Sequence, residues 1–257
     1  MDDTDSGSEP GAGRCVLLSR ALGPQASLAG FREALGEATR ERRASTAPVF
    51  WPYFILVLLF AVFAIGVGLA IAPENRLDRH FDEEGLVTYS SALLMAATSC
   101  FAFLCFLARR DQGGKDVWPW GRWLWLLIGL GFLFFALDEI MEFHEELDMF
   151  VADTSIGRPE SFRNWNDVIV IGYGLVAAVV LLPFLPEVLR YPRFPALLAV
   201  GFGFYALHTL IDSTVSDPTD TSKIFEESAK LFAGAFFSLA VFAALLAIRQ
   251  RRRNPGA

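Results

Sequence analysis

The sequence contains little cysteine and little histidine, with three of each among 257 residues. Cys100 and Cys105 are five positions apart, which places them on different faces of a helix, and Cys15 lies in a polar N-terminal stretch. We therefore expect no disulfide.

Several familiar catalytic signatures are also missing. There is no phosphate loop, dinucleotide fingerprint, H-E-x-x-H or G-x-S-x-G motif, and the multiple-histidine boxes of membrane desaturases are absent. Lys and Arg number 22 against 29 Asp and Glu, and the net charge of -7 excludes a basic surface for nucleic acid. Because the first 48 residues have no short apolar core behind a basic end, no cleavable signal peptide is predicted.

Apolar residues, in contrast, are abundant. They make up 53% of the chain, and the mean hydropathy of +0.39 is typical of a polytopic membrane protein. About 20 consecutive apolar residues cross a bilayer as a helix. Stretches of roughly that length lie at about 50–72, 86–108, 122–144, 167–189, 194–213 and 226–248. The sequence therefore predicts an all-α fold, a polytopic six-helix transmembrane bundle.

The domain organisation follows from these stretches. We expect an N-terminal tail over residues 1–48 that is disordered or partly helical, with a possible short surface helix at 27–43. The transmembrane domain covers 49–249, and a basic C-terminal tail covers 250–257.

The positions of Lys and Arg predict the orientation. The side richer in these residues faces the cytoplasm. By position between the six predicted helices, thirteen lie on the side of both termini and five on the other. The thirteen are Arg40, Arg42, Arg43, Arg109, Arg110, Lys115, Arg122, Arg190, Arg193, Arg249, Arg251, Arg252 and Arg253. Both termini are therefore predicted to be cytoplasmic, in the cell inner membrane.

Three polar runs interrupt the apolar pattern on the opposite, outer side. They are L-D-E-I-M-E-F-H-E-E at 137–146, H-T-L-I-D at 208–212 and E-E-S-A-K at 226–230. A charged group at the centre of a membrane helix costs roughly 2.5–3.5 kcal/mol on insertion scales. Since the third, fifth and sixth helices carry these runs into one layer, we expect them to share a pocket.

The first run has two interpretations. In a continuous helix Asp138, Glu142 and Glu145 share one face, Glu139 lies on a neighbouring face, and His144 points away from Asp138. Three acids on one stripe repel one another unless a cation, a proton or a basic partner intervenes. In the alternative, the helix leaves the membrane near Glu139 and the rest is a solvated extension.

In the second run, His208 and Asp212 are one helical turn apart, as in an imidazole oriented by a carboxylate or a pair of metal ligands. Tyr205, one turn below, can donate a hydrogen bond to either. The alternative is a His–Asp pair that only neutralises itself.

In the third run, Glu226 and Glu227 precede Lys230 by four and three residues, the favourable order for an intrahelical pair. Pairing within this helix is the alternative to a functional role for Lys230. His80 lies in the first outer loop, either at the same pocket or in solvent.

The runs A-L-D-E-I-M-E-F-H-E (136–145) and F-E-E-S-A-K-L-F-A-G-A (225–235) resemble those of uncharacterised bacterial multi-pass membrane proteins. That resemblance implies a fold of this kind and no known activity. The alkaline ceramidase group, membrane hydrolases that hold zinc with three histidines, an aspartate and a serine, is a looser comparison. This sequence lacks the paired-histidine spacing of that group, so its zinc ligands are not carried over.

The leading hypothesis is a divalent-metal site in an outward-facing pocket walled by the third, fifth and sixth helices. Its metal ligands are Asp138, Glu142, His208, Asp212 and Glu226; its catalytic residues are Glu139, His144 and Glu145; and Tyr205, His80, Glu227 and Lys230 complete the pocket. Oxygen and imidazole donors suit zinc, manganese or iron. A metal-bound water would then hydrolyse a lipid or another amphiphile.

Two other classes remain open. One is a proton- or cation-coupled transporter or channel, since intramembrane acids also form ion pathways. The runs W-L-L-I-G-L, L-L-A-V-G-F and F-F-S-L-A-V in the inner halves of the three helices argue against a continuous polar path. The other class is a non-catalytic accessory subunit or sensor.

Overall fold

The computed structural model describes residues 28–41, 49–74, 76–82, 84–110, 120–152, 165–215 and 219–253. Every regular element in these ranges is helical, and six helices are long and apolar enough to cross a membrane. The long elements are α3 (Phe50–Ile71), α4 (Leu86–Arg110), α5 (Gly121–Met141), α7 (Trp165–Leu181), α9 (Phe194–Thr214) and α10 (Asp220–Arg253). The predicted all-α, six-helix membrane fold is confirmed.

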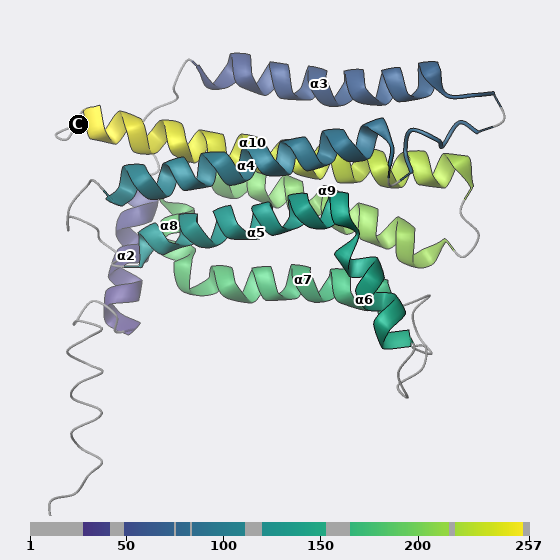
Figure 1. The fold of residues 1–257 in the computed structure, drawn as a ribbon. Coiled ribbons are helices and arrows are strands. Elements are labelled where there is room, and N and C mark those ends of the chain that lie inside the picture. Colours follow the sequence, from purple (N-terminus) through teal and green to yellow (C-terminus); the bar gives the residue numbers. More distant parts are fainter. Residues whose placement is uncertain are drawn as a thin grey trace, which may run out of the picture.

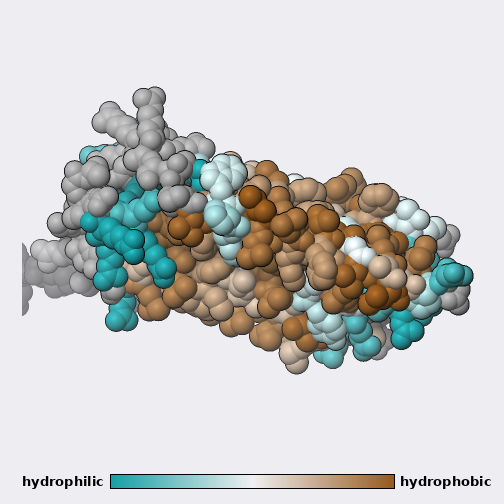
Figure 2. Space-filling view, turned by 90° about the horizontal axis from the view of Figure 1, so that it is seen from above, coloured by the Kyte–Doolittle hydropathy of each residue, from teal (hydrophilic) through white to brown (hydrophobic). Residues whose placement is uncertain are grey.

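The long helices lie side by side and alternate in direction (Figure 1). We call one end of the bundle the basic end, because α4 and α10 finish there with Arg109, Arg110 and Arg251–Arg253. We call the other the acidic end, where α5 and α9 finish and α10 begins. An apolar surface band separates polar patches at the two ends (Figure 2). A shorter helix, α2 (Leu28–Glu41), lies crosswise at the basic end beside α8 (Leu185–Leu189).

The last helix, α10, is the centre of the bundle. In its most apolar stretch 72% of the residues are buried, against 17% to 44% in the other five spans. It packs against α9, α4 and α3, and its buried face is rich in alanine, which allows close backbone approach. At Gly201 of α9, an added Cβ would come within 2.6 Å of the Phe237 ring of α10, so only glycine fits this contact.

Two apolar clusters hold the helices together. One lies toward the basic end around Trp125, Phe194 and Leu245, and the other joins α3, α4 and α10 around Ala61, Val87 and Leu239. The helix α7 belongs mainly to the outside of the bundle: Leu175, Val176, Val179 and Leu182 of this segment and its continuation are each 63% or 64% exposed.

The third span ends earlier than the sequence predicted. We expected one helix over 122–144, but α5 ends at Met141, and α6 (Phe143–Ala152) continues in another direction (Figure 1). Glu142 between them is left-handed, with φ 55°, and its N–H donates to the Asp138 carbonyl at 2.8 Å. The proposed continuous stripe of Asp138, Glu142 and Glu145 is therefore wrong, because the helical register is broken at Glu142.

The other boundaries differ in instructive ways. At Pro183 and Pro186 the helix α7 is followed by a short 3-10 turn, Leu182–Phe184, and then by α8. The last helix was predicted to begin at 226, but it begins at Asp220. A capping box explains this start: Ser222 N–H donates to Thr219 Oγ1 at 3.2 Å, and Thr219 N–H to Ser222 Oγ at 2.9 Å.

Candidate functional site

A cavity of about 880 Å³ lies between α5, α7, α9 and α10. Its walls change character along its length. Toward the basic end the lining is apolar, from Leu124 on α5, Leu181 on α7 and Val241 on α10. Toward the acidic end the lining is charged, and we call this part the acidic mouth. Its described side chains are Asp82, Asp138, Glu139, Glu142, His208, Asp212, Lys223, Glu226, Glu227 and Lys230.

The three polar runs of the sequence thus line one cavity. Asp138 at the end of α5, His208 near the end of α9 and Glu227 in the second turn of α10 are all buried, with 7% to 9% exposure. The capping box sets where α10 begins, and the close α9–α10 packing at Gly201 brings its second turn beside His208. Tyr205 also lines the cavity, with its ring centroid 6.0 Å from that of His208.

Lys230 joins α10 to α5. Its Nζ is 2.8 Å from a carboxylate oxygen of Glu139 and 2.8 Å from one of Glu227, and all three side chains are at most 14% exposed. Thr88 of α4 donates to the other oxygen of Glu227 at 3.4 Å. The expected pairing within the helix is therefore present to Glu227, and a second pair to α5 is added to it. Glu139, which we predicted as a catalytic residue, is one partner of this bridge.

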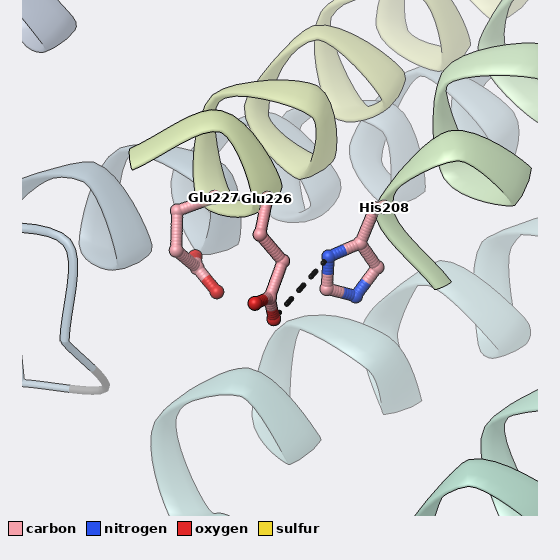
Figure 3. Close-up of side chains that lie close together, drawn as sticks. All are labelled: His208, Glu226 and Glu227. Atoms are coloured by element: carbon pink, nitrogen blue, oxygen red, sulfur yellow. Dashed lines mark ion pairs between the residues drawn. The ribbon is translucent and has the colours of Figure 1, made fainter. Parts of the chain in front are cut away.

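His208 and the two glutamates of α10 form a compact donor set (Figure 3). The His208 Nδ1 atom is 3.8 Å from Glu226 Oε1. One donor atom from each of His208, Glu226 and Glu227 lies within 4.8 Å of the others. The His208–Glu226 separation exceeds a hydrogen bond, and an ion with bonds of about 2.0–2.2 Å fits between two such donors. This set differs from the sequence hypothesis, which named Asp138, Glu142 and Asp212 as ligands beside His208 and Glu226. In the structure, the third member of the compact set is Glu227.

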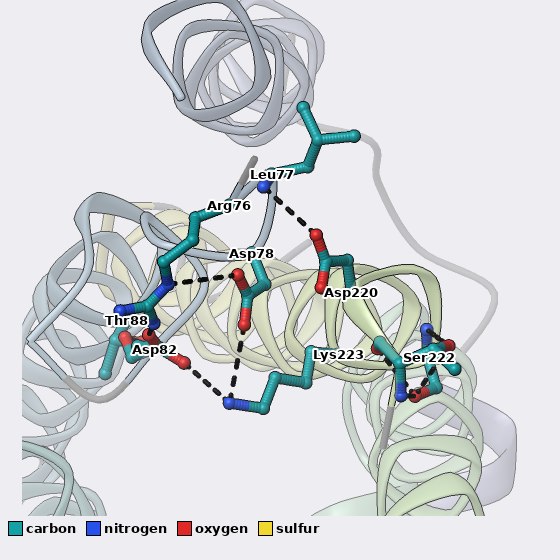
Figure 4. A network of polar contacts seen from close by, with 9 residues as sticks. Arg76, Leu77, Asp78, Asp82, Thr88, Asp220, Ser222 and Lys223 are labelled. Carbon is teal, nitrogen blue, oxygen red and sulfur yellow. Dashed lines mark hydrogen bonds and ion pairs between the residues drawn. The ribbon is translucent and has the colours of Figure 1, made fainter. Parts of the chain in front are cut away.

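At the rim of the mouth lies a polar network that sequence reasoning missed (Figure 4). Lys223 of α10 contacts Asp82 at 2.7 Å and Asp78 at 3.6 Å, and Arg76 contacts Asp82 at 2.9 Å. The Leu77 N–H donates to Asp220 at 3.2 Å. The loop before α4 is thereby tied to the start of α10. The signal available in the sequence was that segments 76–82 and 220–223 both contain acidic and basic residues, which can pair with one another.

The remaining predicted site residues fall into three groups. His80 lies in the loop before α4, where its Cβ is next to Gly68 of α3, and it is not among the side chains that line the cavity. Glu142 does line the cavity, from the left-handed position after α5. The side chains of His144 and Glu145 lie outside the part of the chain that the structure describes.

Charge balance distinguishes the acidic mouth from an ordinary set of ion pairs. Among the described lining residues, seven are acidic and two are lysines, which gives a formal charge of -5 with His208 neutral. Like charges at close range disfavour one another's ionised forms. The arrangement therefore favours either protonation of some of these carboxylates or a bound cation.

Another buried carboxylate, Glu187 of α8, lies far from the acidic mouth and was missed by sequence reasoning. It accepts from Tyr191 at 2.6 Å, Trp125 at 3.1 Å and Arg109 at 3.2 Å, and Arg190 lies 3.7 Å away. Burial and the charge of Glu187 raise the pKa of Tyr191 well above its usual value, so its hydroxyl stays a donor. A lone acid in an apolar stretch, L-L-P-F-L-P-E-V-L, was the available signal.

The chain was compared with known protein families, curated proteins and solved structures. A family model described as a domain of unknown function, DUF8692, matches residues 49–245. The chain belongs to this family. The match covers the first five spans, the sixth span as far as residue 245 and the acidic mouth, which agrees with the coarse resemblance in the sequence. Comparison with curated proteins and with solved structures gives no match.

Proposed function

We propose that this chain is a membrane hydrolase that holds a divalent cation with His208, Glu226 and Glu227 and acts on a lipid or another amphiphile in the adjoining cavity. One observation carries the proposal: the histidine–carboxylate set and a deep apolar space are parts of the same cavity of about 880 Å³. Ligand pockets of roughly 300–1,000 Å³ with a few polar groups in an apolar lining are typical of small-molecule sites.

The chemistry follows from the donor set. An imidazole and two carboxylates suit zinc, manganese or iron. A divalent cation lowers the pKa of a bound water to roughly 7 in favourable sites. A bound ion would supply an activated water for attack on the carbonyl or phosphoryl centre of the amphiphile, and a carboxylate at the mouth would accept the proton of that water and return it to the leaving group. Lys230, held by Glu139 and Glu227, positions Glu227 toward His208.

The orientation supports an outer-leaflet substrate. The described arginines of the predicted cytoplasmic set lie at the basic end, and under the positive-inside rule this supports an acidic mouth that faces the outer side of the inner membrane. The apolar part of the cavity then extends into the membrane interior, where burying the apolar chain of an amphiphile costs little free energy.

A transporter would need a polar path from the acidic mouth to the basic end. The cavity wall instead becomes apolar at Leu124, Leu181 and Val241, among the described residues. This apolar wall favours a one-sided site over a continuous ion pathway. Ion exchange is therefore ranked second as a candidate function.

Metal analysis tests the proposal. Protein purified in an uncharged detergent is expected to hold about one divalent ion per chain, and His208→Ala and Glu226→Gln should each lose most of it. His80→Ala is the matched control, because His80 does not line the cavity, and it should keep the ion. Hydrolysis of lipids in liposomes should stop on chelation and return with metal. Metal-free wild-type protein with unchanged hydrolysis, or equal loss of metal in His80→Ala, would overturn the proposal.

A further inference from the structure

We infer that the cavity takes an amphiphile with an apolar chain and a positively charged head group. An amphiphile of this kind is the substrate class of the site proposed above. Its binding follows from the cavity, and only its hydrolysis rests on the proposed function. Binding depends on three features of the cavity: its length, its width at one glycine and the charge of its mouth.

The length suits one chain in one membrane leaflet. Along α5 the lining runs from Asp138 to Leu124, fourteen residues or roughly 21 Å of helix. Half of a bilayer core is roughly 15 Å. A chain whose head stays at the acidic mouth therefore fits within the cavity.

The middle of the cavity is open at Gly131 of α5. A Cβ added there meets nothing within 4 Å, although Gly131 lines the cavity. On the far side the rings of Phe132, Phe202 and Phe237 pack together with centroid distances of 5.2 Å, which closes the wall between α5, α9 and α10. A larger side chain at position 131 would therefore narrow the passage to the apolar end.

The mouth selects the sign of the head group. Its described lining has a formal charge of -5, and a bound divalent ion still leaves -3. Lys230 shows how the mouth accommodates an ammonium group, with a carboxylate oxygen at 2.8 Å on each side. Tyr173 and Tyr205 add aromatic rings to the same lining, and aromatic faces attract cations. An anionic head group would instead meet like charge.

The test uses three probes with the same twelve-carbon chain: dodecylamine, dodecanol and dodecanoate. Equilibrium binding to purified protein in an uncharged detergent is expected to be at least about tenfold tighter for the amine than for the alcohol, and weakest for the carboxylate. Asp212→Asn and Glu142→Gln should each weaken amine binding severalfold and leave alcohol binding unchanged. The exposed Glu84→Gln is the matched control and should change neither. Equal affinity for the three probes would overturn the inference.

The chain part is tested separately. Gly131→Leu should abolish binding of dodecylamine and retain binding of hexylamine, because the passage beyond residue 131 is blocked. Gly203→Leu is the matched control, since Gly203 also has nothing within 4 Å but is exposed and does not line the cavity. The same effect in both variants would contradict the inference. Amine binding is also measured on protein that has been treated with a chelator, which separates the two proposals. If the native protein holds no metal and still binds the amine, only the metal-dependent function is overturned.

Discussion

Two buried charged clusters lie at opposite ends of this bundle, and they are built differently. At the basic end, Glu187 is surrounded by donors from α4, α5 and its own segment, including Arg109 at 3.1 Å. At the acidic end, the carboxylates outnumber the lysines and border a large cavity. The first cluster satisfies a charge with the protein's own groups. The second concentrates charge where a ligand can enter, which is the property expected of a binding site.

The largest effect on stability is expected from a substitution that breaks the first cluster. Glu187→Gln removes the charge that faces Arg109 and leaves a buried guanidinium uncompensated, so we expect a loss of about 3–5 kcal/mol in the free energy of unfolding. Unfolding of the variant in mixed detergent micelles measures this. The metal content of the folded fraction should equal that of the wild type. A loss below about 1 kcal/mol would mean that Glu187 is not a structural centre.

Lys230→Met makes the corresponding change in the second cluster. It leaves Glu139 and Glu227 facing each other, but the adjoining cavity admits water or a cation, so the expected loss is smaller, roughly 1–3 kcal/mol. Adding a divalent cation should restore part of the stability of Lys230→Met and none of that of Glu187→Gln. If the cation stabilised both variants equally, the proposed difference between the clusters would fail.

Tyrosines provide a finer comparison. Tyr191→Phe removes the 2.6 Å hydrogen bond to buried Glu187 and should cost about 1–3 kcal/mol. Tyr205→Phe alters a side chain of the cavity lining, and we expect a change within about 0.5 kcal/mol. For dodecylamine binding the order of the two effects should be reversed, because only Tyr205→Phe changes the ligand site. Thermal unfolding and dodecylamine binding on the same preparations measure both effects.

The contrast between the clusters also shows which features a sequence can reveal. The six spans were predictable because each is a long local run of apolar residues. The polar runs of α5, α9 and α10 were visible because charge is conspicuous in such runs. Glu187 was missed because its partners Arg109 and Trp125 come from distant helices, and Arg109 was interpreted only as a determinant of orientation.

Other features depended on backbone geometry that the sequence does not announce. Neither glycine nor proline marks the end of α5, and yet Glu142 is left-handed there and redirects the chain. The cavity itself arises because α7 stands at the outside of the bundle, where its contact with α5 is made by the rings of Phe134, Phe135 and Tyr173. No local pattern in the α7 sequence reports that separation.

The smallest expected effect concerns the polar network at the rim of the mouth. Lys223 is 36% exposed and Asp82 is 31% exposed, so their 2.7 Å ion pair is screened by solvent and salt. Lys223→Ala should cost no more than about 1 kcal/mol, and less at high salt. The same change makes the mouth more negative, so dodecylamine binding should strengthen at low salt. Unfolding and binding at two ionic strengths would separate these effects, and weaker amine binding in Lys223→Ala would show that the charge of the mouth does not select its ligand.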